Sequence, residues 1–316
     1  LKESHRAQKY LKNRGINQNS IEIFNIGYAP SEKNSLYNYL QKEGFDEKLI
    51  RISRLVNNFV DFFQDRIIIP INDQTGKTIA FGGRSLETQS EIPKYINSPD
   101  TLIFKKGDTI FALFQAKKHI KEKGYVILME GYTDVILSHQ YGFMNSVAPL
   151  GTALTFEQLN KIKRLTSKIL LMFDGDEAGI QASDRSLSSL FQAGFIVKVV
   201  ILPKGHDPAS IIQKYGEKSF KNYISKALSP VEFYLNISPK RSLNEKIYEF
   251  LAKISYIKNL IYRDELIKEL SEKTSINELT LREELRKICQ NKKSEKSLLQ
   301  KERAYLLNEE EIILRI

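Results

Sequence analysis

Two short apolar runs, each ending in a carboxylate, most constrain what this chain can fold into. Tyr125–Met129 ends in Glu130, and Ile169–Phe173 ends in Asp174 and Asp176. Short apolar runs of this kind are typical of buried parallel strands. Ligands of open α/β sheets bind at the carboxyl edge, where such acids lie. The sequence therefore predicts an acidic site at one edge of a parallel sheet.

Carboxylates that meet at one edge repel one another unless a cation lies among them. Asp134, one helical turn after Glu130, and Asp207, after a later strand, are predicted to lie at the same edge. Asp-Gly-Asp is also a common turn and N-cap sequence, so a purely structural role is the alternative. A second strand that ends in an acid favours a site for a hard divalent metal.

The middle of the chain alternates between strand-like and helix-like segments. Such a series predicts a parallel sheet with right-handed crossovers. Thr155 and Gln158 form a capping-box pair, and no Gly-x-Gly-x-x-Gly opens any of the helices, which argues against a dinucleotide fold. The predicted strands are 125–129, 145–149, 168–173 and 196–202, and the predicted helices are 133–141, 156–166 and 177–193.

The flanking segments differ from this pattern. Before it, the sequence predicts helices over 5–15, 35–44 and 46–55 and a hairpin of 62–72 with 78–84. Thr75–Thr78 is not a P-loop, because Ile71 stands where a glycine is required. After Pro230 the spacing is helical over 231–236, 242–257, 259–271, 278–289 and 299–314, and Lys292–Lys296 is interpreted as a solvated linker.

The charge of the chain indicates a polyanionic partner. Lys and Arg number 48 against 38 Asp and Glu, which gives a net charge of +10 and a pI near 9.3. Arg84 follows two glycines, and Lys94, Lys105 and Lys106 follow it with Tyr95 and Phe104 interleaved. Charge mixed with aromatic rings is typical of single-stranded nucleic-acid binding. The alternative is a solvated Lys-rich loop with two core aromatics.

Cysteine usage and hydropathy limit the setting. The one cysteine, Cys289, permits no internal disulfide and no cysteine-based zinc site. No apolar run in the sequence is long enough to cross a membrane. We expect a cytoplasmic protein without membrane attachment.

Taken in order, these motifs resemble a known family. Glu130–Asp134 with Asp174–Gly179 is similar to the Toprim domain of DnaG-type primases, topoisomerases and some nucleases. The flanking motifs Arg66–Asp73, Phe81–Arg84, Lys94–Pro99 and Leu202–Pro208 resemble the RNA polymerase core of bacterial DnaG-type primases. The resemblance runs nearly from end to end. It implies a Toprim-type parallel sheet (107–229) flanked by a basic mixed α+β subdomain (1–106) and a C-terminal helical bundle (230–316), an α/β and α+β fold.

The resemblance also implies a function and site residues. It implies a DNA-templated RNA polymerase that makes RNA primers on single-stranded DNA from ribonucleoside triphosphates. Glu130, Asp174 and Asp176 match the acids that bind Mg²⁺ or Mn²⁺, with Asp134 and Asp207 in support. Arg14, Arg84, Lys94, Asn97 and Lys106 match template and nucleotide positions. Lys204 and Ala209 stand where many relatives carry acids. This departure leaves open how many metal ions the loop around Asp207 helps to bind.

The family also has parts that we do not expect in this chain. We expect neither its zinc-binding module nor its helicase-docking domain, so the replicative helicase and single-strand binding protein are expected partners of a longer form. A Toprim topoisomerase, a Toprim nuclease and a non-catalytic nucleic-acid binding module are the competing hypotheses. The two enzymes would use the same acids, whereas a binding module would tolerate their loss.

Overall fold

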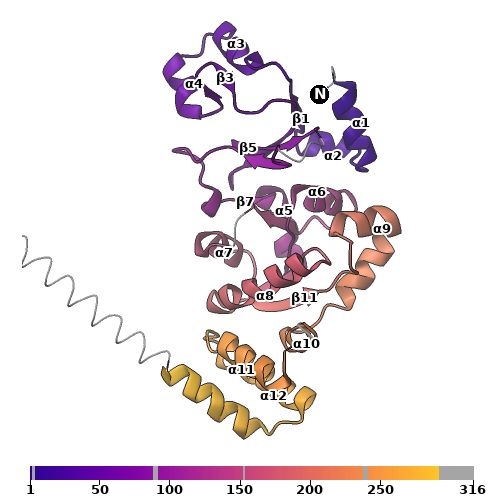
Figure 1. The fold of residues 1–316 in the computed structure, drawn as a ribbon, viewed down its shortest axis with the longest axis vertical. Coiled ribbons are helices and arrows are strands. Elements are labelled where there is room, and N and C mark those ends of the chain that lie inside the picture. The colour runs from indigo at the N-terminus through magenta and orange to yellow at the C-terminus, as the bar shows by residue number, and fades with distance from the viewer. Residues whose placement is uncertain (2–3, 88–91, 152–153, 238–240, 292–316) are drawn as a thin grey trace, which may run out of the picture.

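The computed structural model describes residues 1, 4–87, 92–151, 154–237 and 241–291. Figure 1 shows three parts stacked along the long axis, with the N-terminal elements at one end and helices at the other. The central part contains a five-stranded sheet. No helix in the described ranges has both the length and the apolar character needed to cross a bilayer.

The N-terminal part is built on a four-stranded antiparallel sheet of order β1-β4-β5-β6. The predicted hairpin is confirmed as β4 paired with β5, whereas β6 was not predicted as a strand. A smaller lobe of α3, α4 and the β2–β3 hairpin lies between β1 and β4 in the chain. The elements are α1 His5–Asn13, α2 Gln18–Ile23, β1 Gly27–Ala29, α3 Ser35–Lys42, α4 Glu47–Ser53, β2 Val56–Asn57, β3 Val60–Asp61, β4 Arg66–Asn72, β5 Thr78–Ser85 and β6 Tyr95–Asn97.

The turn between β4 and β5 confirms the interpretation of the Gly-Lys-Thr sequence as a turn. The Asp73 carboxylate accepts hydrogen bonds from the backbone N–H groups of Thr75 and Lys77. Gly76 has a φ of 95°, which favours glycine. The turn is therefore closed by its own side chain, and no cradle of free N–H groups is formed.

The central sheet has the order β11-β10-β8-β9-β7. Its four predicted strands are parallel, as expected, and β7 adds an antiparallel edge that was not predicted. The helices α5 and α9 were likewise not predicted. The elements are η1 Lys106–Asp108, β7 Ile110–Phe111, α5 Leu113–Lys123, β8 Val126–Leu128, α6 Tyr132–Gln140, β9 Ser146–Pro149, α7 Phe156–Lys163, β10 Lys168–Met172, α8 Glu177–Gln192, β11 Ile196–Val200 and α9 Pro208–Ser225.

The sheet separates two apolar cores because successive side chains of a strand point to opposite faces. Val126 and Leu128 belong to the core formed with α5, α7, α8 and the C-terminal helices. Ile127 and Met129 belong to the core formed with α6, α9, α1 and the N-terminal sheet. Both faces are thus covered, which explains the continuous apolar strands.

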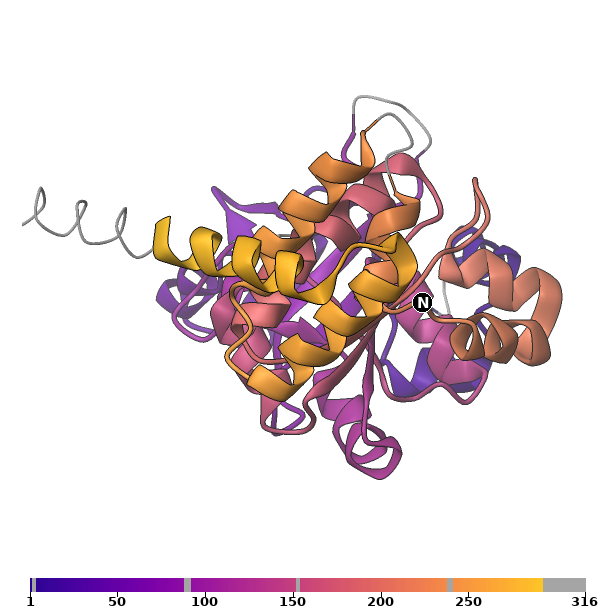
Figure 2. The same cartoon turned by 90° about the horizontal axis from the view of Figure 1, so that it is seen from below.

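Helices form the C-terminal region, as predicted. They are α10 Pro230–Asn236, α11 Leu243–Ile254, α12 Leu260–Thr274 and a helical stretch over 278–291. Ser229 with Glu232 and Ser242 with Glu245 form capping boxes that begin α10 and α11. Figure 2 shows these helices lying across the lower end of the molecule. The predicted linker Lys292–Lys296 and the predicted helix over 299–314 lie outside the described residues.

Candidate functional site

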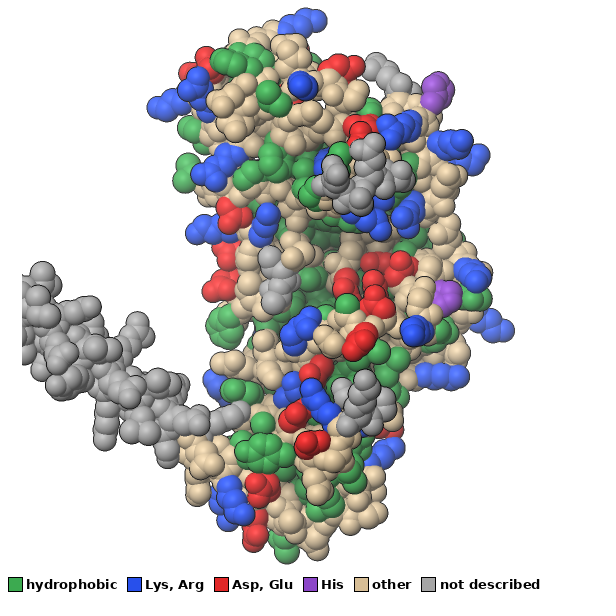
Figure 3. All heavy atoms as spheres, in the orientation of Figure 1, with side chains coloured by type: hydrophobic (Ala, Val, Ile, Leu, Met, Phe, Trp, Pro, Cys, Tyr) green, Lys and Arg blue, Asp and Glu red, His purple; other side chains and the backbone are tan. Residues whose placement is uncertain are grey.

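Glu130 and Asp174 lie side by side because they follow neighbouring strands. Leu128 of β8 pairs with Leu171 of β10, so both strands end at the same edge. An Oε1 atom of Glu130 accepts a hydrogen bond of 3.1 Å from the backbone N–H of Asp174. Figure 3 shows acidic side chains gathered at a hollow in the middle of one face, with Lys and Arg side chains above them.

Two glycines of the Asp174–Gly179 motif let the chain come this close. A Cβ atom on Gly175 would lie 2.3 Å from the carbonyl oxygen of Pro203. A Cβ atom on Gly179 would lie 2.3 Å from the carbonyl oxygen of Asp174 and 2.9 Å from Oε1 of Glu130. Any side chain here would push the β10 loop away from Glu130.

The remaining three acids are each fixed by a backbone N–H group. Asp176 is the N-cap of α8 and accepts from Gly179 at 2.8 Å, whereas Asp207 is the N-cap of α9 and accepts from Ser210 at 2.6 Å. Asp134 is buried, and its Oδ1 accepts from the N–H of Ala209 at 3.1 Å. The Asp-Gly-Asp sequence therefore does cap a helix, which was the alternative to a metal site. Capping uses one carboxylate oxygen of Asp176 and leaves the other free to bind a cation.

Burial and neighbouring carboxylates raise the pKa of three of the acids, Glu130, Asp134 and Asp174. Burial first, and then the carboxylates of Glu130, Asp207 and Asp176, raise the pKa of Asp174 to about 7, while Lys94 opposes the rise. Burial together with Asp207 and Asp174 raises the pKa of Asp134 to about 8. Burial and Asp176 also raise the pKa of Glu130. The cluster therefore carries repulsion that a bound cation would relieve.

The chemistry of the cluster fits a hard divalent cation. Oδ1 of Asp174 is buried and has no hydrogen-bond partner, and the donors are carboxylate oxygens, which Mg²⁺ prefers. Within the described residues, however, no three His, Cys, Asp or Glu side chains are placed so that they could hold one ion. The strand ends bring the acids to one edge, but the geometry of a closed ligand shell is not formed there. The assignment of metal ligands remains a prediction.

Three predicted nucleic-acid contacts lie on β5, on β6 or just before β6. Arg84, on β5, is 9% exposed, and Lys94 is exposed and lies close enough to Asp174 to oppose its pKa rise. Asn97 donates a hydrogen bond of 3.0 Å to the carbonyl oxygen of Leu150, at the end of β9. This contact joins β6 to the carboxyl edge of the central sheet.

Arg14, just after α1, approaches the acids from another side. Burial lowers the pKa of Arg14, but Tyr10, Tyr95 and Asp207 outweigh that effect and raise it. Its guanidinium lies over the ring of Tyr10, 5.6 Å from the centroid. Arg14 and Asp207, 193 positions apart by their residue numbers, are therefore close enough to interact.

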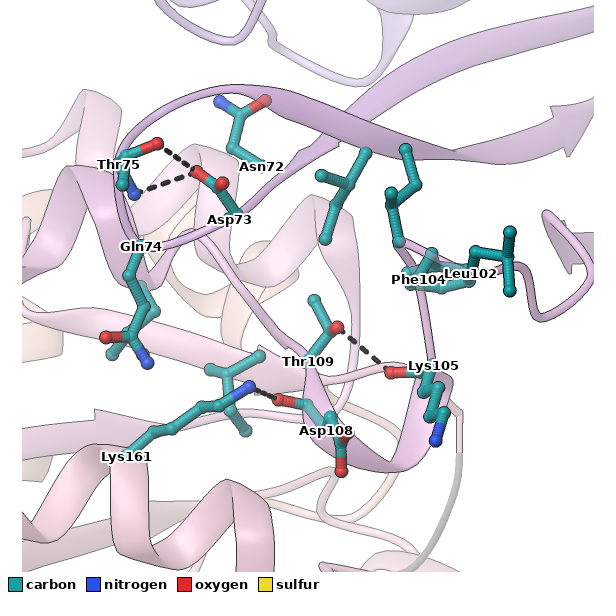
Figure 4. Close-up of a pocket in the computed structure, with 14 residues that line it drawn as sticks. Asn72, Asp73, Gln74, Thr75, Leu102, Phe104, Lys105, Asp108, Thr109 and Lys161 are labelled. Atoms are coloured by element: carbon teal, nitrogen blue, oxygen red, sulfur yellow. Dashed lines mark hydrogen bonds between the residues drawn. The ribbon is translucent and has the colours of Figure 1, made fainter. Parts of the chain in front are cut away.

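Lys105 and Lys106 lie elsewhere. Lys106 begins the turn η1, and its backbone N–H and C=O bond to Asp100 and Gln158. Lys105 lines a separate pocket of about 500 Å³ between the β4–β5 turn and α7, together with Asp73 and Lys161 (Figure 4). That these two lysines bind nucleic acid together with Arg84 and Lys94 stays a prediction.

Sequence reasoning missed four side chains of the site. Tyr132 and Thr133 follow Glu130 by two and three positions and bond to β6, and that closeness in sequence was the available signal. Tyr10 contacts two of the predicted arginines. Arg185 lines a pocket of about 380 Å³ that adjoins Glu130, and it opposes the pKa rise of that acid. No motif in the sequence pointed to Tyr10 or Arg185.

Comparison with known proteins places similarity along most of the chain. Residues 1–117 match the family described as the DNA primase catalytic core, N-terminal domain, and residues 127–212 match the Toprim-like family. The DNA primase of Aquifex aeolicus is 35% identical over 305 residues, which is 95% of this chain and 61% of that protein. The chain spans about half the length of other curated relatives, such as the 48% covered in the Clostridium acetobutylicum DNA primase.

Solved structures agree with this similarity. A DNA primase domain from Pseudomonas aeruginosa is 31% identical, with a TM-score of 0.79 and coverage of 91% of this chain and 94% of that one. A DnaG primase catalytic domain bound to single-stranded DNA is also 31% identical, with a TM-score of 0.76 and coverage of 87% and 93%. Both cover the N-terminal part and the central sheet together.

Proposed function

This chain belongs to the DnaG-type DNA primases, within their catalytic core, and on that premise we propose that it synthesises short RNA primers on single-stranded DNA. The reaction would be attack of a ribose 3′-hydroxyl on the α-phosphate of a ribonucleoside triphosphate, with release of pyrophosphate. The observation that carries the proposal is the arrangement at one sheet edge: Glu130 lies beside Asp174, and the exposed Lys94 of the N-terminal part lies close enough to Asp174 to oppose its pKa rise.

Glu130, Asp174 and Asp176 are the residues we propose for holding Mg²⁺ or Mn²⁺, with Asp134 and Asp207 supporting them. The raised pKa values of Glu130, Asp134 and Asp174 and the unpartnered Oδ1 of Asp174 support this assignment. When bound, such an ion supplies positive charge that polarises the α-phosphate and lowers the pKa of the attacking hydroxyl. The glycines keep the carboxylates in place while they bind.

Basic residues would bind and orient the substrates. Lys94 is exposed next to the acids, so its ammonium can contact a triphosphate there. Arg14 and Arg84 would contact phosphate groups through their guanidinium N–H donors. Asn97, which donates to the carbonyl oxygen of Leu150, fixes β6, and Lys94 directly precedes that strand. Because one relative's catalytic domain has been solved with single-stranded DNA, we propose the same class of template for this chain.

The wider setting follows from the family rather than from this chain. The curated relatives extend beyond the part it covers, so a replicative helicase and a single-strand binding protein are proposed partners of the whole protein. We also propose subdomains at 1–106, 107–229 and 230–316, and action in the cytoplasm. None of these proposals is needed for the chemistry at Glu130 and Asp174.

The decisive experiment is primer synthesis on single-stranded DNA with labelled ribonucleotides, with and without Mg²⁺ or Mn²⁺. The wild-type chain is compared with Asp174→Ala and with Glu177→Gln, a matched control because Glu177 is an exposed acid in the same motif. We expect short RNA products that require the metal and Asp174 but not Glu177. Extension of an annealed RNA oligonucleotide tests elongation separately from initiation.

Other outcomes would overturn the proposal. Metal-dependent cleavage of the DNA in place of synthesis would move the chain to the Toprim nucleases or topoisomerases. Full synthesis by Asp174→Ala would show that the reaction does not depend on the proposed metal-binding acid Asp174. Absence of both synthesis and extension, with DNA binding retained, would leave a binding module.

A further inference from the structure

Tyr10, on α1, lies against two arginines of the proposed site. The centre of its ring is 5.6 Å from the guanidinium carbon of Arg14 and 5.2 Å from that of Arg84. The ring of Tyr95 contacts Arg84 as well, at 5.3 Å. Cations within about 6 Å of an aromatic centroid are attracted to its negative face. Two cations therefore share one aromatic ring, and a second ring holds one of them.

Neither arginine forms a salt bridge among the described residues, although Asp207 lies close enough to Arg14 to raise its pKa. In the described part of the chain, the arginines in ion pairs are Arg6, Arg51, Arg241 and Arg282. Arg84 is only 9% exposed, donates to the carbonyl oxygen of Ser85, and has a buried Nε atom without a hydrogen-bond partner. Burying a guanidinium without a counter-ion is unfavourable, so this arrangement is expected where an anion binds.

The position of Tyr10 comes from its helix. Ala7 and Leu11 are buried and fix α1 against the core. Tyr10 and Arg14 are four positions apart, which places them on one face of the helix. The Tyr10 hydroxyl is buried, and its interaction with Arg14 raises the pKa of that guanidinium. The ring is the part of Tyr10 that contacts both arginines.

We propose that Tyr10 is a positioning residue for phosphate binding, an inference that rests on the proposed primase function. Its ring attracts both guanidiniums and so holds two like charges in one place that would otherwise repel each other. Arg14 and Arg84 then keep their remaining N–H donors for the phosphate groups of a nucleotide or of a strand. Loss of the ring would leave both arginines in the chain but no longer arranged together.

Graded replacement of the ring tests this inference. Tyr10 is changed to Phe, to mono-, di- and trifluorinated Phe, and to Leu, with Tyr248→Leu as the control at an exposed tyrosine on α11. Two binding measurements are made: ATP with Mg²⁺, and a labelled single-stranded DNA. We expect Tyr10→Phe to rescue binding to within about twofold, Tyr10→Leu to weaken it about tenfold, and each added fluorine to weaken it stepwise.

The fluorinated series keeps the inference falsifiable if Tyr10→Leu does not fold, because those rings keep the size of Phe. A change confined to ATP, with KM raised more than kcat lowered, would assign the arginines to the triphosphate. A change confined to DNA would assign them to the strand. Affinities that do not vary with fluorination would overturn the inference. If the wild-type chain made no RNA, the proposed function would fail, whereas the two binding series would still decide the role of Tyr10.

Discussion

The hydroxyl of Tyr132, in the first turn of α6, donates a hydrogen bond to the side-chain oxygen of Asn97 on β6. A second contact, 3.1 Å between the hydroxyl oxygens of Tyr95 and Thr133, joins the same two elements. Because Tyr132 and Thr133 follow Glu130 by two and three positions, these bonds fix β6, which Lys94 directly precedes, beside the acids. The two halves of the proposed site are thus held together by tyrosines.

Tyr132→Phe should weaken this connection without removing it. The ring would still pack under Gly82, where a Cβ atom would lie 2.7 Å from Cζ of Tyr132. Loss of the hydroxyl removes one hydrogen bond, which costs about 1 kcal/mol of unfolding free energy. We expect a small decrease in Tm and a several-fold decrease in kcat/KM for primer synthesis, because Asn97 and Lys94 are less well fixed.

Thermal unfolding and single-turnover synthesis of the same preparation measure the two effects. Tyr125→Phe serves as the control, because Tyr125 lies before β8, at the end of that strand opposite to Glu130. An unchanged kcat/KM in Tyr132→Phe would show that the Tyr132–Asn97 bond is dispensable for activity.

Mg²⁺ should stabilise the wild-type chain at pH 8. The pKa of Asp174 is raised to about 7, so above that pH the folded protein holds a repelling charge that unfolding would release. An ion at ten times its Kd adds about 1.4 kcal/mol to the unfolding free energy. Asp174→Asn should raise the Tm of the metal-free protein at pH 8 and abolish the increase caused by Mg²⁺.

Differential scanning calorimetry with EDTA or Mg²⁺ compares the two chains, and Glu177→Gln should behave as wild type. The same Mg²⁺ response in Asp174→Asn would place the ion elsewhere. The sign is specific to this cluster: stability of the metal-free wild type should fall as pH rises from about 4 to 7, because over that range the unfolded chain has lost the Asp174 proton while the folded chain keeps it.

The sequence predicted the acidic edge because the evidence for it is local. Glu130 and Asp174 each follow a short apolar strand. Their closeness can be predicted from the rule that neighbouring parallel strands end at the same edge of a sheet. The Tyr132–Asn97 bond could not be predicted in this way, because it depends on how two sheets pack. The same holds for Arg14 and Asp207, whose interaction joins the first helix to the last loop of the sheet.

Lys94 and Lys105 show how far two neighbours in sequence can separate in the fold. Lys94 lies close enough to Asp174 to oppose its pKa rise, whereas Lys105 lines the pocket beside Lys161. The intervening chain turns at Thr101, whose hydroxyl oxygen accepts from the N–H of Phe104. The lysines are neighbours in sequence, but the turn at Thr101 places their side chains on different parts of the surface.

Replacing Lys94 and Lys105 separately should distinguish these two positions. Each phosphate contact contributes about one unit to the slope of log Kd against log salt concentration. We expect Lys94→Gln to reduce that slope for single-stranded DNA by about one, and Lys105→Gln to leave it near the wild-type value. Fluorescence anisotropy over a salt series measures both, and equal slopes for the two variants would show that Lys105 contacts the DNA as Lys94 does.

His139 should make the chain sensitive to acid independently of the acidic site. Burial, with smaller effects from His119 and Lys123, lowers the pKa of His139 to about 4, and its Nε2 lies 2.9 Å from the carbonyl oxygen of Ser146. The neutral ring donates that bond through Nε2–H. Its Nδ1 is buried without a partner, so a proton added there would have no hydrogen-bond acceptor.

The direction of this effect follows from which state binds the proton. Below about pH 6.5 His139 is protonated in the unfolded chain but not in the folded chain. Up to about 3 kcal/mol of the unfolding free energy present at pH 7 is therefore lost between about pH 6.5 and 4. The acids of the site act in the opposite direction, so the difference between variant and wild type is the useful quantity. His139→Gln keeps an N–H donor for Ser146 but cannot titrate. Its Tm should therefore rise relative to wild type as pH falls from 7 to 4.5, as measured by calorimetry, and a constant difference across that range would mean that His139 is accessible to protons in the folded state.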